Sequence, residues 1–167
     1  MRRRSADDAV EPTRASSNMT QDNHSVAEMG RAAVTGAIER RGARVKEIRQ
    51  GNLVFLEATR PGAAERIRFR VKTRTGGTWQ GSIRDGDPDP APAIPPTFWV
   101  FVDLKNPRTP DFYIAPDDWV RRDIHAAHQV YLDRHGGERA FSKDSTHHAI
   151  QLRRIVQWRN RWDLSGL

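Results

Sequence analysis

The sequence predicts an α/β domain in which helices flank a central mixed sheet of about five strands. Three observations lead to this fold class. Residues 66–73 alternate between basic and apolar side chains, which is the pattern of a strand with one face in a core. Residues 98–104 form the most apolar run of the chain and indicate a buried strand. Residues 26–41 carry apolar side chains at helical spacing, which indicates a helix packed on the sheet.

The N-terminal part of the chain divides into a tail and a helix. Residues 1–24 are polar and contain almost no large apolar side chain, so we expect a disordered tail there and a single domain over residues 25–167. Ser25 and Glu28 match a capping box, and the helix is expected to begin directly after this cap. Gly42 supplies its C-terminal stop.

Short apolar segments separated by turn residues predict the strands. Residues 50–52 and 61–62 contain the glycine, asparagine and proline typical of tight turns. Residues 85–97 are rich in aspartate and proline and predict an exposed loop before the fourth strand. The expected strands cover residues 43–48, 53–59, 66–73, 98–104 and 111–115.

Two further helices are expected after the last strand. Pro116 and the two aspartates that follow it favour a helix start, and residues 136–137 are glycines that end the helix near His135. A final helix is expected over residues 148–161. In that helix Ile155, Trp158 and Trp162 would lie on one buried face.

The charge of the chain is positive and belongs to the predicted domain. The 167 residues include 28 lysines and arginines against 21 aspartates and glutamates, a formal net charge of +7. The tail over residues 1–24 carries equal numbers of basic and acidic residues, so the whole excess lies in the domain. A basic domain attracts polyanions, of which nucleic acid is the commonest. The alternative, a solvated surface in an arginine-rich protein, is equally compatible with the composition.

The composition excludes several other classes of protein. The chain has no cysteine, so disulfides and thiolate metal sites are excluded, and a cytoplasmic location is expected. No apolar run approaches the ~18 residues of a membrane-spanning helix. The N-terminal arginines are not followed by an apolar stretch, so no secretory signal is expected.

The segment that ends in Val71, Lys72 and Thr73 carries a family resemblance. Together with Gly30 and Gly42 in the first helix and residues 52–58 in the second strand, it resembles the core of the PD-(D/E)XK, or restriction-endonuclease-like, nuclease superfamily. The resemblance spans residues 26–114. The closing segments are similar to those of a small set of uncharacterised bacterial proteins with this core, at residues 111–114, 131–132 and 158–163.

The resemblance implies metal-assisted hydrolysis of phosphodiesters, with Mg²⁺ held by carboxylates of the second and third strands. This sequence departs from that pattern. Arg31 stands where the helix glutamate is expected, Phe55 where the second-strand aspartate is expected, and Arg70 where the third-strand acid is expected. Only Lys72 remains. The preferred interpretation is therefore an inactive nuclease site that needs no metal or cofactor.

An active enzyme is the first alternative. Glu57 lies two residues after Phe55, on the same strand face, and can replace the missing aspartate. Glu57 and Lys72 would then be the catalytic residues of a Mg²⁺-dependent endonuclease, and Mg²⁺ is expected in that case alone.

In the preferred interpretation the former metal cleft binds nucleic acid, in the first place DNA. Guanidinium groups match phosphate oxygens without a metal, and an aromatic side chain after the third strand can stack on a base. The expected binding residues are Arg31, Arg68, Arg70, Lys72 and Trp79. The arginines can instead form salt bridges with nearby glutamates, and a protein–protein interaction module with incidental charge is the remaining alternative. The sequence leaves a homodimer open.

Three histidines lie on one face of the helix expected before residue 136. His125, His128 and His135 have a spacing that can place them near one another. The spacing matches no standard zinc pattern, and His135 is well placed to interact with the helix dipole. We therefore predict no metal site at these residues.

Overall fold

The computed structural model describes residues 14–138 and 145–167. A sheet with strand order β1-β2-β3-β5-β6 forms its centre. Neighbouring strands are antiparallel except β3 and β5, which run parallel. The predicted α/β class, with a mixed five-stranded sheet flanked by helices, is confirmed. The strands are β1 (Arg44–Gln50), β2 (Leu53–Thr59), β3 (Arg66–Arg74), β5 (Thr97–Asp103) and β6 (Asp111–Pro116).

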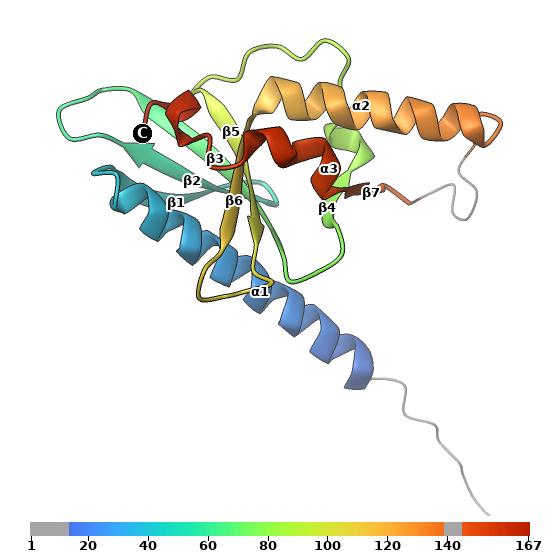
Figure 1. Cartoon of the computed structure of the whole chain (residues 1–167), viewed down its shortest axis with the longest axis horizontal. Helices are drawn as coiled ribbons and strands as arrows, with labels where there is room; N and C mark the ends of the chain where they lie inside the picture. The colour runs from blue at the N-terminus through green and yellow to red at the C-terminus, as the bar shows by residue number, and fades with distance from the viewer. Residues whose placement is uncertain (1–13, 139–144) are drawn as a thin grey trace, which may run out of the picture.

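Helix α1 (Arg14–Glu39) covers one face of the sheet (Figure 1). Its residues Val34 and Ile38 are fully buried against Phe69 of β3 and neighbouring side chains of the sheet. The approach is closest at Gly30, where a Cβ would lie 1.8 Å from Oγ1 of Thr73. Gly30 therefore lets the helix backbone lie directly on β3.

Helix α2 (Asp117–Arg134) packs on the other face, against β5 and β6. A second buried core lies beneath it and contains Trp99, Phe101, Tyr113 and Ile124. A separate two-stranded ribbon, β4 (Trp79–Ser82) with β7 (His147–Ile150), closes this core from the side. The two faces of the sheet thus carry separate cores, one under each long helix.

Helix α1 begins earlier than the sequence predicted. The predicted tail includes residues 14–24, but α1 starts at Arg14, while residues 1–13 lie outside the described part of the chain. No glycine or proline interrupts residues 14–29, and extending an existing helix is far easier than nucleating one. Neither this helix nor any other in the described ranges is long and apolar enough to cross a membrane.

The predicted C-terminal helix is wrong. Residues 147–167 instead form β7, the short helix α3 (Leu152–Ile155) and two 3₁₀ turns, η2 (Val156–Trp158) and η3 (Trp162–Ser165). The chain passes over the edge of β6, where the Asn160 amide donates to the Phe112 carbonyl at 2.9 Å. Ile155 consequently joins the core under α2, whereas Trp162 joins the core under α1. A segment that wraps around a sheet edge buries some side chains on each face of the sheet. Here the spacing of these buried residues along the chain resembles that of a helix, which explains the wrong prediction.

Candidate functional site

The basic side chains of β3 project from the sheet face opposite α1. Ile67 and Phe69 point into the core under α1, so strand alternation sends the intervening residues to the other side. We call the surface of β1, β2 and β3 on that side the outer face. Its β3 row consists of Arg66, Arg68, Arg70, Lys72 and Arg74.

At the start of this row, a buried carboxylate gathers three cations. The Glu57 side chain of β2 is 2% exposed, and Arg68 Nε donates to its Oε2 at 3.2 Å. Lys46 Nζ and Arg66 Nη1 lie 3.1 Å and 3.8 Å from its Oε1. Burial raises the pKa of the Glu57 carboxyl, but the hydrogen bonds from Lys46 and Arg68 and the charges of Lys46 and Arg66 outweigh burial and lower it. Glu57 is therefore an anchor for basic side chains.

At the end of the row, two arginines are held by partners from other segments. Arg70 donates to both carboxylate oxygens of Asp85, at 2.7 Å and 3.1 Å, and lies 4.2 Å from the centre of the Trp99 ring. Asp85 belongs to the 3₁₀ turn η1 (Ile83–Asp85). Arg74 donates to Asp103 at 2.6 Å and 3.0 Å and stacks on Trp79 at 3.7 Å. Both guanidinium groups are therefore held by contacts within the folded protein.

Lys72 lies between these two arginines and has a different environment. Its Nζ lies 5.7 Å from the centre of the Trp99 ring. Among the residues that the structure describes, no carboxylate forms an ion pair with it. Burial, and then the charge of Arg70, lower the pKa of Lys72 to about 8, with Asp85 opposing the shift. Lys72 is therefore a half-buried cation without a carboxylate of its own.

Two of the predicted binding residues do not join this row. Arg31 donates from α1 to Glu47 of β1 at 3.0 Å, on the sheet face that α1 covers, so it lies on the opposite side from Lys72. Trp79 is 0% exposed, and its Nε1 donates to the Val102 carbonyl at 2.9 Å. Its ring is enclosed by the core under α2, so the prediction that Trp79 stacks on a base is corrected.

The two candidate catalytic residues are also separated. Glu57 pairs in register with Arg68, which lies four residues before Lys72. At ~3.3 Å per residue, this separation is ~13 Å along the strand. Within residues 14–138 and 145–167, no three histidine or acidic side chains are placed to hold a metal ion. The described residues therefore do not assemble around Lys72 the group of carboxylates that Mg²⁺ needs.

Two of the three histidines predicted to share a face of α2, His128 and His135, line a pocket of about 660 Å³, whereas His125 lies beside Gly86 and is not part of its lining. Tyr131 stacks between His128 and His135, with ring centres 6.5 Å and 4.2 Å away. His135 Nδ1 lies 2.7 Å from the Tyr131 carbonyl oxygen. The opposite wall contains His147 and His148 of β7. His128 and His135 thus take part in ring stacking and lie where α2 faces the ribbon.

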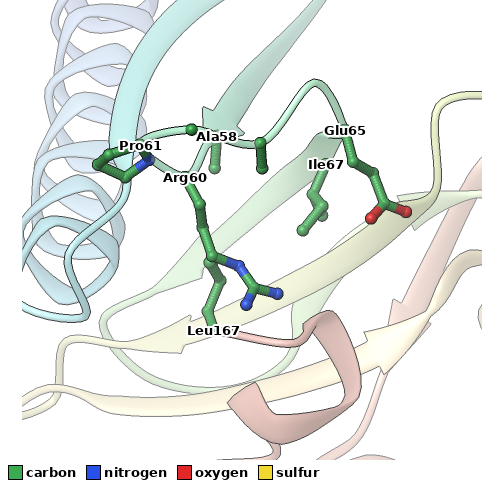
Figure 2. A pocket seen from close by; sticks show the side chains of 8 residues that line it. Ala58, Arg60, Pro61, Glu65, Ile67 and Leu167 are labelled. Carbon is green, nitrogen blue, oxygen red and sulfur yellow. The ribbon is translucent and has the colours of Figure 1, made fainter.

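A smaller pocket of about 370 Å³ lies between the β2–β3 turn and the C-terminal residues. Figure 2 shows the Arg60 side chain reaching from this turn toward Leu167, and Ala58 and Ile67 also line the pocket. Glu65 is the acidic residue of its lining. This pocket lacks the grouped acid, base or nucleophile that catalysis requires.

Sequence reasoning missed three apolar residues of the outer face. Ile48 of β1 pairs in register with Phe55 of β2, and Leu53 lies two residues before Phe55. None of the three belongs to either buried core. The sequence does contain a signal for them. Besides the apolar residues of β1 and β2 that face α1, both strands carry apolar residues at the positions in between.

Comparisons with protein-family models, curated proteins and solved structures find no match to this chain. The resemblance to the PD-(D/E)XK superfamily therefore stays a prediction. Any functional conclusion therefore rests on the chemistry of the outer face.

Proposed function

We propose that this chain is a cytoplasmic nucleic-acid-binding protein with a PD-(D/E)XK-like arrangement and an inactive nuclease site. The observation that carries the proposal is the charge of the outer face. This face carries seven basic side chains against three carboxylates, an excess of four positive charges. The basic set is Arg44, Lys46 and the β3 row; the acidic set is Glu57 together with Asp85 and Asp103, which pair with the row from neighbouring segments.

The cations best placed to meet phosphates lie near Glu57. The side chains of Lys46 and Arg66 are 62% and 60% exposed. Arg66 approaches Glu57 only to 3.8 Å, so it can turn to a phosphate without losing a short hydrogen bond. Arg68 is mostly covered and completes the local positive charge. DNA is the first candidate because a phosphate backbone supplies regularly spaced anions.

The surroundings of Glu57 and Lys72 support the proposal of an inactive site. Metal-assisted hydrolysis needs carboxylates grouped around one or two cations, but Glu57 is already held by three basic side chains. Any Mg²⁺ at Glu57 would have to displace Lys46 and Arg68 and would face their repulsion. An active endonuclease using Glu57 and Lys72 would therefore require a rearrangement of β2 against β3.

Fluorescence anisotropy with labelled DNA between about 50 and 200 mM salt tests binding. We expect log affinity to fall linearly with log salt, and Arg66→Ala to reduce the slope by up to ~0.9. Arg122→Ala is the matched control, because Arg122 is an exposed arginine on α2 that pairs with Asp118. Absence of binding at low salt would contradict the proposal and favour the interaction module.

Incubation of supercoiled plasmid with the protein and Mg²⁺ or Mn²⁺ tests the inactive site. We expect the plasmid to remain intact. Metal-dependent cleavage that disappears in Glu57→Ala would contradict the inactive site and support the migrated-acid alternative.

A further inference from the structure

An apolar strip lies next to the exposed cations of the outer face. We define the outer strip as Ile48, Leu53 and Phe55. Leu53 is 40% exposed, and Phe55 is partly exposed. Their neighbours Leu56 and Ala58 point the other way, into the core under α1. Within residues 14–138 and 145–167, the outer strip is therefore a partly exposed apolar surface that belongs to neither buried core.

No long helix of the described chain covers this strip. Helix α1 lies on the opposite face, and α2 packs on β5 and β6. Figure 1 shows α2 running from the β6 side of the sheet away from β1 and β2. Lys46 lies two residues before Ile48, and Glu57, with its cations, lies two residues after Phe55. The strip and the exposed cations thus form one continuous surface.

We infer that the nucleic acid bound at the outer face is single-stranded, with bases on Phe55 and Leu53 and phosphates at Lys46 and Arg66. This inference rests on the proposed function. A duplex keeps its bases stacked inside and offers a flat sheet its phosphates, to which an apolar strip contributes nothing. A single strand exposes base faces that stack on aromatic side chains while basic groups follow its backbone.

The spacing of the surface suits this division of contacts. Side chains on one strand face recur every ~7 Å, and neighbouring strands lie ~4.8 Å apart. Lys46 is therefore about one nucleotide's reach from Phe55, since Ile48 is the register partner of Phe55. The same nucleotide can place its phosphate on the cations and its base on the strip.

A second copy of the chain fits this surface less well than a single strand. A two-fold dimer places the same patch of both copies face to face. The cation excess on each outer face would then meet the same excess on its partner, and like charges at short range repel. Single-stranded nucleic acid supplies negative charge for the exposed cations and base faces for the apolar strip.

Anisotropy at one low salt concentration tests the inference, with the full chain, a labelled DNA single strand and the duplex of the same sequence. We expect the single strand to bind more tightly. Phe55→Ala should weaken single-strand binding roughly tenfold and leave duplex binding within about twofold. Phe55→Trp should retain single-strand binding. Val156→Ala is the control, because Val156 is an exposed apolar residue of the C-terminal segment.

Three outcomes would overturn the inference. Equal affinity for both DNA forms, insensitive to Phe55→Ala, would overturn it and leave the proposed function standing. Absence of binding to either form would overturn both. If light scattering finds a dimer that Leu53→Asp converts to a monomer without changing single-strand affinity, the strip is an interface between copies. Circular dichroism on each variant separates these results from loss of fold.

Discussion

The two ends of β3 present the same sequence pattern but opposite surroundings. Arg66 and Arg68, at its start, share one buried carboxylate on an open surface. Arg70 and Arg74, at its end, each have a carboxylate and a tryptophan ring of their own. Alternation of basic and apolar residues therefore predicts which side chains share a face. It does not predict which of them are available to a ligand, because that depends on partners from distant segments.

Segments that arrive later in the chain produce this difference. Asp85 comes from η1, Asp103 from β5 and Trp79 from β4, and all three gather at the end of β3. An arginine that forms an ion pair and stacks on an aromatic ring in a water-poor site contributes more to folding stability than an arginine in an exposed ion pair. The end of β3 therefore contributes mainly to stability, and we propose that its start contributes to binding.

Removing a carboxylate at the end of β3 should have the largest effect. In Asp103→Ala, Arg74 would remain buried without its partner, and we expect a loss of about 2–4 kcal/mol of unfolding free energy. Both side chains of this pair are 11% exposed. Urea unfolding measures the loss, with Asp163→Ala in the exposed Arg161 pair as a control that should change stability little. If Asp103→Ala lowers the unfolding free energy no more than Asp163→Ala does, the two ends of β3 do not differ in their contribution to stability.

Neutralising the carboxylate at the start of β3 should have a smaller effect on stability and a positive effect on binding. Glu57→Gln leaves three cations without a counter-charge, and we expect about 1–3 kcal/mol of destabilisation. DNA affinity at low salt should rise, because the outer face loses its buried negative charge. Glu47→Gln, on the face covered by α1, is the matched control. Unchanged or weaker DNA binding in Glu57→Gln would place the binding surface elsewhere.

Lys72 provides the smallest predicted effect, with a pH signature. Burial lowers the pKa of Lys72 from 10.5 to about 8, so folding at neutral pH desolvates a charged amine. Lys72→Met should therefore stabilise the protein at pH 7, by on the order of 1–2 kcal/mol. Above pH 8 the folded wild type loses this proton before the unfolded chain does. Its stability should accordingly rise relative to Lys72→Met until about pH 10.5.

Unfolding of both proteins at pH 7 and pH 10 measures this signature. Lys105→Met, at an exposed lysine, is the control for the effect of replacing a surface lysine by methionine. If the difference in unfolding free energy between wild type and Lys72→Met stays constant or grows from pH 7 to pH 10, the Lys72 pKa is not lowered.

Most of the fold could be predicted from the sequence because its signals are local. The alternation at residues 66–73 and the apolar run at residues 98–104 correctly indicated β3 and β5, which pair in parallel. The ribbon of β4 and β7 was missed, because a four-residue strand acquires its identity from a partner far along the chain. The edge crossing before Trp162 was missed for the same reason.

The candidate site was less predictable than the fold. That Arg31 and Lys72 lie on opposite faces depends on which side of the sheet α1 covers, and spacing along the chain does not contain that information. The pairing of Arg70 joins β3 to a loop rich in aspartate, where several acids were equally plausible partners. The family pattern points to Phe55 only as the position of a missing acid, although the partly exposed apolar ring of Phe55 is the more informative property.

An NMR titration of the ¹⁵N-labelled full chain with a short DNA single strand tests the central claim most directly. We expect the largest amide shift changes at the outer face, around Lys46, Phe55 and Arg66. The amides around His128 of α2 should change little. Shift changes concentrated on α2 and β7, with the amides of β1, β2 and β3 unperturbed, would contradict the assignment of the outer face as the binding surface.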